Sequence, residues 1–541
     1  MTTDWLHAFF VQHLPVLPVL VPLFTAAALL FLGDSPERLR LQRRIALASA
    51  VFGAVLAWRL LTEAAAGSLS VYPLGGWPAP FGIVLVVDRL SALMLALTWT
   101  IAVPVLWYAT GGWDSHGRYF HALFQFQLMG LSGAFVTGDL FNLFVFFEVL
   151  LISSYVLLVH GQGRDRFRAG VHYVVLNLAA SALFLIGLAI VYGVTGTLNM
   201  ADLGLRVAQL DAEQATLLKA GAMVLLVVFG LKAAIVPLYL WLPNTYAAAS
   251  APVAALFAIM TKVGVYSIIR VHGVMLGPDA GHAALAAAPW ILPLALLTTV
   301  LGVLGALAAH SLARLVSYLT VSSVGVILIG VGLFSTEALS AALYYTVHST
   351  LVMAALFLLV ELVASQRGKV GDHLQPAAQV AQPVLLGLMT LLGAASAAGL
   401  PPLPGFLGKL MVLESAAPSA AHTMVWTVVL SAGFFTLVGL ARAGSILFWS
   451  VLPDRPGECG AGSSGRLTTA TLGLLGVSLL LAVAASPMKR YTDAAAVQLA
   501  DRNGYAEAVL NATGGADSRT TRPYQAGRGE VRLPTYESAA P

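Results

Sequence analysis

The lysines of this 541-residue chain stand in unusual places. Four of the six fall within long apolar stretches: Lys219, Lys232, Lys262 and Lys409. A charge at the centre of a membrane helix costs roughly 2.5–3.5 kcal/mol on insertion scales, so such residues usually have a function. A buried lysine can release its proton, whereas an arginine cannot. The chemistry that these residues predict is proton transfer within a membrane.

One glutamate provides an acid to match these lysines. Glu148 lies within the apolar run 140–160. An ionised carboxylate without a partner would be expensive there, so we expect Glu148 to be protonated or paired with a buried cation, with Lys232 as its partner. The alternative is a static ion pair that joins two helices. Lys219 lies near the end of its stretch, where a lysine can reach the membrane interface, and is expected to be structural.

Two apolar stretches carry residues that should break a helix beside a lysine. In the first, Lys232 precedes Pro237. In the second, Lys409 follows four helix-breaking residues: Pro401, Pro402, Pro404 and Gly405. An internal proline removes a helix hydrogen bond and frees a backbone carbonyl. Paired interrupted spans of this kind indicate an ion site where two repeats meet, and the alternative is a pair of ordinary proline kinks.

Histidine and hydroxyl side chains could connect these lysines. His348 lies early in an apolar stretch and is a candidate for a proton relay, although a lone histidine can equally be a packing residue. His160 and His172 lie near the ends of their stretches and are less favoured. A polar stripe could hold a chain of water molecules or only pack helices: Ser317, Thr320, Ser322 and Ser323.

The composition indicates what kind of protein positions these residues. Of all residues 58% are hydrophobic and 10% are charged, and the mean hydropathy is +0.84. Because soluble domains average about 25% charged residues, we expect a polytopic membrane protein and no nucleic-acid partner. The single cysteine, Cys459, excludes a disulfide framework or a four-cysteine metal site within the chain. Without a phosphate-binding loop or a dinucleotide motif, we expect no metal, no cofactor and no enzymatic activity.

The expected fold is all-α, because only helices or closed barrels satisfy the backbone in lipid and the apolar runs show no alternation. Spanning takes roughly 20 apolar residues. We predict about fourteen spans, of which the twelfth is interrupted: 14–32, 45–65, 83–108, 119–137, 140–160, 169–193, 214–242, 251–275, 289–309, 315–334, 339–364, 380–415, 422–449 and 467–487.

The two breaks lie five spans apart, which fits two inverted repeats of five helices. The predicted regions are three N-terminal helices (1–118), a first repeat (119–275), a second repeat (289–449), a last span (467–487) and a polar tail (488–541). The mixed charges of the tail predict disorder or loose attachment.

The basic residues between the spans predict the orientation. If the N-terminus lies outside, thirteen basic residues fall in inside loops: Arg38, Arg40, Arg43, Arg44, Arg118, Arg164, Arg166, Arg168, Arg314, Arg367, Lys369, Arg455 and Arg466. The outside loops then hold Arg206, with Arg59 and Arg89 near helix ends. Because cytoplasmic loops are enriched in Lys and Arg, we predict that both termini lie outside the cytoplasm.

Several strings resemble the antiporter-like subunits shared by respiratory complex I and Mrp-type cation/proton antiporters. They are 137–148 (TGDLFNLFVFFE), 231–243 (LKAAIVPLYLWLP), 261–270 (TKVGVYSIIR) and 401–410 (PPLPGFLGKL). The likeness covers roughly 80–490. The glutamate string and 193–202 (GVTGTLNMAD) are most similar to the D-type subunit of the Mrp antiporter, and a complex I subunit is the nearest rival.

The resemblance implies a role for each residue. Glu148 matches the family's helix-5 glutamate and Lys232 the helix-7 lysine that pairs with it. Lys262 matches the connecting helix-8 lysine, Lys409 the helix-12 lysine that passes the proton onward, and His348 the helix-11 histidine. One departure concerns helix 10, where related complex I subunits often carry a histidine and this chain reads 322–325 (SSVG), so a relay there would use serine and water.

These observations together predict a membrane subunit of a multisubunit Na⁺/H⁺ antiporter in a bacterial inner membrane, with other subunits as partners. Since no cluster of acidic ligands for a hard cation is visible, coupling to Na⁺ is expected to involve another subunit. The alternatives are a proton-pumping subunit of a complex I relative, a transporter of organic solutes, and a scaffold whose lysines form static pairs.

Overall fold

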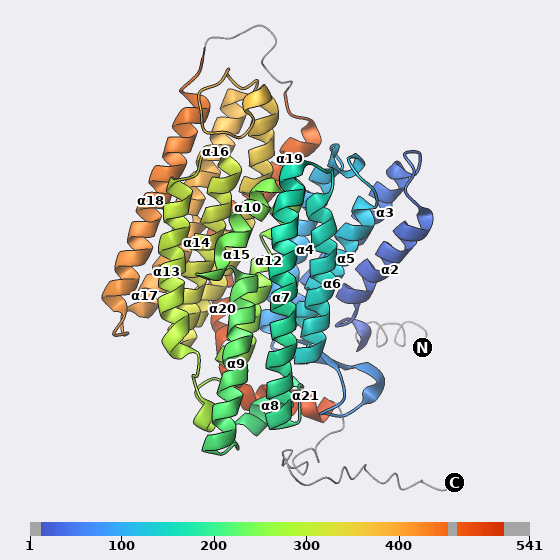
Figure 1. Cartoon of the computed structure of the whole chain (residues 1–541), viewed down its shortest axis with the longest axis vertical. Helices are drawn as coiled ribbons and strands as arrows, with labels where there is room; N and C mark the ends of the chain where they lie inside the picture. Colours follow the sequence, from blue (N-terminus) through green and yellow to red (C-terminus); the bar gives the residue numbers. More distant parts are fainter. Residues whose placement is uncertain (1–11, 453–461, 513–541) are drawn as a thin grey trace.

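The structure is a computed structural model that describes residues 12–452 and 462–512. Helices that run roughly parallel to the long axis form nearly the whole molecule (Figure 1). The part before the first predicted repeat contains α2 (Leu17–Leu32), α3 (Leu39–Ala65), β1 (Ser70–Pro73), β2 (Val84–Val87) and α4 (Arg89–Ala109). Cys459 and Arg455 lie outside the described residues.

The next two groups of helices fall within the ranges of the predicted repeats. The first contains α5 (Phe120–Val136), α6 (Leu140–Val159), α7 (Arg164–Thr195), α8 (Met200–Val207), α9 (Ala212–Ala233), α10 (Trp241–Ala248), α11 (Ala251–Phe257), α12 (Met260–Ile268) and the π-helix η4 (Ile269–Met275). The second contains α13 (Ala288–Leu307), α14 (Leu312–Gly332), α15 (Thr336–Gln366), α16 (Pro383–Ala398), α17 (Pro404–Ala416) and α18 (His422–Phe448). Short 3₁₀ turns are η1 (Leu74–Gly76), η2 (Trp113–Ser115), η3 (Leu238–Leu240), η5 (Gly281–Ala283) and η6 (Gly368–Val370).

The prediction of an all-α polytopic membrane protein is confirmed. Within the described residues, eleven helical segments are long and apolar enough to cross a membrane: 39–65, 89–109, 140–159, 164–195, 212–248, 251–275, 281–307, 312–332, 336–366, 422–448 and 465–483. Three shorter apolar helices, α2, α5 and α16, fall on the remaining predicted stretches. Because these three are shorter than the others, a total of fourteen spans stays a prediction.

One predicted span begins too early. Residues 84–87 form strand β2, which pairs antiparallel with β1 so that Ser70 lies opposite Val87. A run of valines favours extended backbone, and the helix starts only where Asp88 caps it by accepting a hydrogen bond from Ser91 N at 2.8 Å. Strand β2 contacts α4 and α5, and strand β1 contacts α21 (Arg502–Ala512).

The predicted disordered tail is wrong for residues 488–512. They form α20 (Ala485–Ala500) and α21 (Arg502–Ala512), which follow α19 (Gly465–Val483). Tyr491 donates to the carbonyl of Arg89 at 2.8 Å, and Gln498 accepts from the Arg89 amide at 2.9 Å. The segment is amphipathic: its overall composition is polar, but one face of its helices is buried, and composition alone does not indicate that face. Residues 513–541 of the predicted tail lie outside the described residues.

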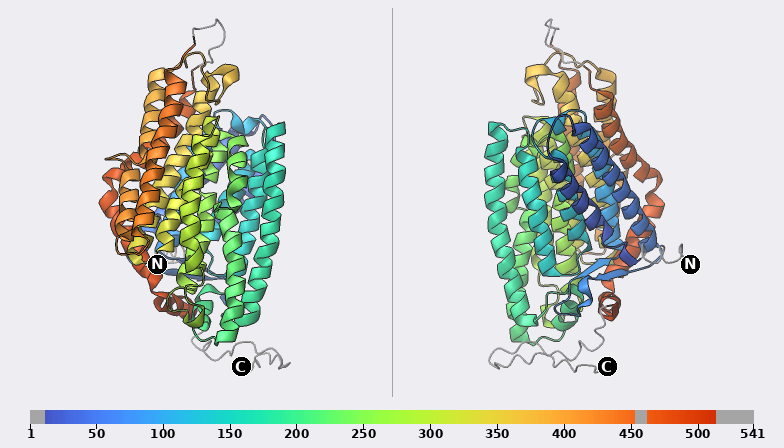
Figure 2. Two further views of the ribbon diagram at one scale, coloured as in Figure 1. Left: turned by 60° about the vertical axis from the view of Figure 1, so that its left-hand side comes forward. Right: turned by 90° about the vertical axis from the view of Figure 1, so that its right-hand side faces the viewer.

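The centre of the bundle is formed by helices with almost no outward-facing side. The apolar part of the segment 251–275 is buried throughout, and those of α14 and α15 are nearly so. In contrast, less than half of the apolar part of α3, α7, α18 and α19 is buried. Figures 1 and 2 show these outer helices around the buried ones. Polar side chains carried by the inner helices are therefore shielded from lipid.

Candidate functional site

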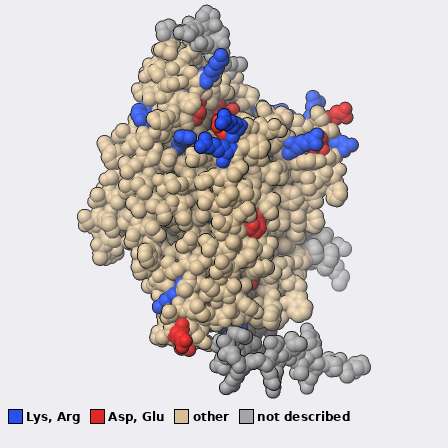
Figure 3. Space-filling model, in the orientation of Figure 1, with Lys and Arg blue, Asp and Glu red and all other residues tan. Residues whose placement is uncertain are grey.

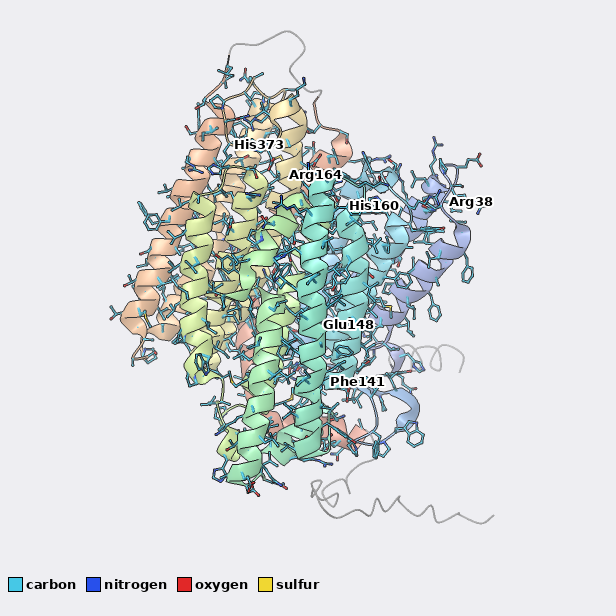
Figure 4. The ribbon with its side chains drawn as sticks, viewed as in Figure 1. Arg38, Phe141, Glu148, His160, Arg164 and His373 are labelled. Carbon is cyan, nitrogen blue, oxygen red and sulfur yellow. The ribbon has the colours of Figure 1, made fainter. Side chains whose placement is uncertain are left out.

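Glu148 lies on α6 and faces α7. Figure 4 shows it between Phe141 and His160, at mid-height of the molecule. Its Oε1 accepts a hydrogen bond from the Ser181 hydroxyl. In the same orientation, Figure 3 shows an almost uncharged middle band, with basic residues gathered toward the upper end. Among the described residues, the carboxylate thus accepts a hydrogen bond from one hydroxyl, and it lies half-buried at mid-height of the molecule.

Lys232 does not form the predicted direct pair with Glu148. Its Nζ donates to Asn177 Oδ1 at 2.9 Å and lies 5.8 Å from the centre of the Phe147 ring. Among the described residues, no carboxylate oxygen lies within 4 Å of this nitrogen. Asn177 and Ser181 are four residues apart on α7 and therefore share one helix face. The acid and the ammonium therefore hydrogen-bond to neighbouring side chains of a third helix, α7.

The first helix break is built around Lys232. Helix α9 ends with Ala234 in the left-handed conformation, at φ 63°. The freed Leu231 carbonyl accepts from Trp241 Nε1 at 2.9 Å, and the Val236 amide donates to Thr298 Oγ1 at 3.0 Å. Lys232 occupies the last turn of α9, where the negative end of the helix dipole favours a cation. Neighbouring side chains thus satisfy the backbone groups that the break leaves open.

Lys262 on α12 is the most isolated of the lysines. It is 0% exposed, and within the described structure its Nζ has no hydrogen-bond partner. Helix α12 reaches the end of α9 because Gly264 has no side chain: a Cβ there would lie 2.5 Å from Ala233 N and 2.8 Å from the Phe229 carbonyl. The close approach places the Lys262 helix directly against the first break.

The second break surrounds Lys409. Helix α16 ends at Ala398, Gly399 adopts φ 86°, and α17 begins at Pro404. Lys409 Nζ donates to the carbonyl of Ala398 at 2.7 Å and to that of Ala397 at 3.3 Å. These are unpaired carbonyls at the end of a helix, where a cation is favoured. The ammonium is therefore bound by backbone rather than by an acid.

His348 on α15 faces the start of α17. The ring is 1% exposed, and its Nδ1 has no partner within the described residues. A Cβ on Gly405 would lie 2.7 Å from His348 Nε2, so the glycine leaves the space that the ring fills. The histidine thus lies at the second break, close to the helix that carries Lys409.

Other candidates from the sequence lie apart from these groups or are engaged elsewhere. His160 contacts the Trp113 carbonyl at 3.2 Å, His172 is exposed, and Lys219 is half-buried near one end of α9. The polar stripe is buried, and each of its hydroxyls donates to a backbone carbonyl at 2.7–3.1 Å: Ser317, Thr320, Ser322 and Ser323. In this arrangement the stripe supports helix packing on α14.

Sequence reasoning missed Asn177 and Ser181. The available signal was that these two polar residues lie four positions apart within an apolar stretch, which places them on one face of a helix. It also missed a buried ion pair in which the Arg270 guanidinium donates to both oxygens of Asp88 at 2.6 Å. This pair joins π-helix η4 to the cap of α4. Among the described residues, no group of three or more His, Cys, Asp or Glu side chains is arranged to hold a metal ion.

Comparisons with known proteins agree with the fold. A sequence model of the NADH:quinone oxidoreductase/Mrp antiporter transmembrane family matches residues 137–436. The chain is 41% identical to the D-type subunit of a probable K⁺/H⁺ antiporter from Rhizobium meliloti (strain 1021), over 94% of this chain and 99% of the relative. It is 36% identical to the D-type subunit of a Na⁺/H⁺ antiporter from Bacillus subtilis (strain 168), over 92% and 99% respectively.

Solved structures show the same likeness. A chain of the Mrp complex from Dietzia sp. DQ12-45-1b aligns with a TM-score of 0.83 and 28% identity, over 92% of this chain and 99% of that one. A chain of respiratory complex I from Thermus thermophilus aligns with a TM-score of 0.75 and 24% identity, over 90% and 99%, which is a likeness of fold.

Proposed function

Because the chain belongs to the NADH:quinone oxidoreductase/Mrp antiporter family, we propose that it is the D-type membrane subunit of a multisubunit monovalent cation/proton antiporter. Na⁺ and K⁺ are both candidate cations, since the names of the two relatives differ in this respect. The chain works as one part of a transporter that an ion gradient drives, within a hetero-oligomeric complex in a bacterial inner membrane. Its assignment to the D type rests on relatives aligned over nearly their whole length.

Protons move along a row of groups that this chain supplies. The row runs from Glu148 through Lys232 and Lys262 to Lys409, with His348 beside the last step. The observation that carries this proposal is the surroundings of Lys262: a fully buried amine without a hydrogen-bond partner among the described residues, on a helix that abuts the Lys232 break. A charge there is unfavourable unless it is transient, so each amine's proton affinity depends on whether its neighbour is charged.

We expect coupling to the cation to involve another subunit. Hard monovalent cations are bound by oxygen ligands, and the described residues do not gather acidic side chains into such a site. The chain therefore carries the proton half of the exchange. We also propose that the two broken helices belong to two inverted five-helix repeats, residues 119–275 and 289–449, because the breaks lie five predicted spans apart.

The Arg-rich end faces the cytoplasm. Figure 4 places Arg38 and Arg164 at the upper end, whereas Figure 1 shows α8 and α21 at the lower end. Since basic residues accumulate on the cytoplasmic side of membrane proteins, α21 and both termini lie on the external side.

Replacing Glu148 by Ala tests the proposal. We expect cation-dependent dissipation of a pH gradient to disappear in everted membrane vesicles, while the complex still assembles and NADH oxidation is unchanged. Glu213→Gln, at an exposed position at the start of α9, is the matched control and should exchange normally. Near-normal exchange by Glu148→Ala contradicts the proposal, and a parallel loss of NADH oxidation points to a redox-linked pump instead.

A further inference from the structure

A cavity lined by four arginines opens at the Arg-rich end of the molecule. It has a volume of about 310 Å³, and its charged lining comes from two helices that are distant in sequence: Arg40, Arg43 and Arg44 at the start of α3, and Arg466 at the start of α19. Trp107 of α4 and Leu47 of α3 complete one side. The lining contains no acidic residue. Such a concentration of positive charge favours an anion.

The four arginines are not equally available. Arg43 is committed to Asp114, to which its Nε and Nη2 donate at 2.6 and 2.7 Å. Burial alone would raise the pKa of Asp114, but hydrogen bonds from Arg43 and His121 outweigh it and hold that pKa below the ordinary value. Arg466 donates to the Thr110 carbonyl at 3.2 Å and lies over the Trp107 ring. Among the described residues, the guanidinium groups of Arg40 and Arg44 have no hydrogen-bond or ion-pair partner, and both are exposed.

The cavity continues toward the start of α19. An adjoining space of about 550 Å³ shares Trp107, Thr110 and Arg466 and is also lined by Ser464 and Gly465. Ser464 is the cap residue of this 19-residue helix and makes no side-chain capping bond. The first amides of a helix lack partners within it and point at whatever lies beyond its end, where they bind phosphate readily. The start of α19 and Arg466 therefore line a space that adjoins the cavity of Arg40 and Arg44.

The surface that leads away from the cavity is apolar. Helix α3 exposes Val51, Val55 and Trp58 along its outward face, at 50%, 61% and 51%. Helix α4 packs against both α3 and α19 and is largely buried. Trp107 of α4 lines the arginine cavity and is partly exposed, as is typical of aromatic residues at a membrane interface.

From this arrangement we propose that the arginine cavity and the outward face of α3 bind an anionic phospholipid, with its phosphate in the cavity and its acyl chains along α3. A soluble phosphate would use only the cavity, whereas a diacyl lipid also covers the exposed valines and Trp58. Arg40 and Arg44 hold the headgroup, and Arg43 and Arg466 shape the cavity. The site is separate from the proton row, since none of its residues contributes to that row.

The test measures retention of lipid by the intact complex. Delipidated complex is titrated with phosphatidylglycerol or phosphatidylcholine, and bound lipid is counted by native mass spectrometry. Each arginine near a membrane surface contributes about a fivefold gain in affinity for anionic lipid, so the double variant Arg40→Gln/Arg44→Gln should bind phosphatidylglycerol about 25-fold more weakly. Arg164→Gln/Arg168→Gln, two exposed arginines at the same end but outside the cavity, should bind like the wild type.

Four outcomes would overturn the proposal. In the first, the control variant loses phosphatidylglycerol as strongly as the cavity variant, which would show that the lipid binds to the basic surface in general. In the second, the wild type binds phosphatidylcholine as well as phosphatidylglycerol. In the third, inorganic phosphate or glycerol phosphate displaces the lipid completely at equal concentration, which means a site for a free anion. In the fourth, the cavity variant loses a neighbouring subunit while the number of bound lipids is unchanged, which would show that the arginines contact another subunit and not a lipid.

Discussion

The two helix breaks hold their lysines in different ways. At the first, Lys232 belongs to the helix that ends and donates to the side chain of Asn177, which lies one turn from the Ser181 partner of Glu148. At the second, Lys409 belongs to the helix that begins and donates to carbonyls of the helix before it. Side-chain partners can rotate when a nearby carboxylate changes charge, whereas carbonyl partners are fixed. If the proposed proton row operates, we expect the first break to respond to the charge of Glu148 and the second to hold a proton in transit.

Among variants that leave Glu148 and the lysines in place, removing the side-chain partner of Lys232 should have the largest effect. Asn177→Leu deprives Lys232 of its hydrogen bond while leaving Glu148 and Ser181 in place. A hydrogen bond to a charged group contributes about 1.5–3 kcal/mol, so antiport in everted vesicles should fall about 10- to 150-fold.

The matched variant at the second break is Ser396→Ala. Its hydroxyl is buried without a partner among the described residues, and Lys409 relies on carbonyls, so exchange should stay near normal. The contrast between the breaks fails if Asn177→Leu transports like the wild type, or if Ser396→Ala is equally impaired.

A second variant sharpens the account of how Lys262 reaches the first break. Gly264→Ala introduces a Cβ that would lie 2.5 Å from Ala233 N, so α12 must move away from α9. Overpacking of this kind costs about 1–3 kcal/mol, and we expect a lower Tm of the complex together with slower exchange.

The control for that variant is Gly230→Ala on α9. Its added Cβ would meet nothing closer than 3.6 Å, at Ile235 Cδ1. We expect little change in Tm or exchange. Equal behaviour of the two variants would show that contact between α9 and α12 does not matter.

The smallest effect is expected at an ion pair whose charges stay fixed, in contrast to the lysines. Asp114 has a pKa below its ordinary value, so its contribution to stability is complete above the unfolded pKa near 3.8 and is lost as the pH falls through the lower folded value. Asp114→Asn should lower the Tm by about 1–3 °C at pH 7, and the difference should shrink below about pH 4. Exchange at pH 7 should be almost unaffected. A large transport defect would place this pair in the proton route.

Much of the site could be predicted from the sequence because its signals are local. Lys232, Pro237 and the run from Pro401 to Gly405 identify the breaks, since burial of a lysine and the missing amide of a proline depend on few neighbours. The apolar runs likewise located the helices within several residues. These features need no knowledge of how helices pack.

The remaining features depend on packing between distant segments. Whether Asn177 faces Lys232 depends on the rotation of α7, and one residue of error turns a side chain by about 100°. The Asp88–Arg270 pair joins residues 182 positions apart. The helices α20 and α21 were mistaken for a disordered tail because an amphipathic segment that covers a surface has the composition of a soluble one. The sequence does not predict strand β2 because its residues begin an apolar run that is also typical of a helix.

The central claim is that these amines release and regain protons during transport. It is tested most directly by Lys232→Arg and Lys409→Arg, each measured for cation/proton exchange in everted vesicles with the complex shown to be assembled. Arginine keeps the positive charge and can still donate hydrogen bonds, but it does not deprotonate. The account predicts that both variants assemble and lose exchange almost completely. Exchange close to the wild-type rate in either variant would show that a fixed charge is sufficient there and would contradict the account.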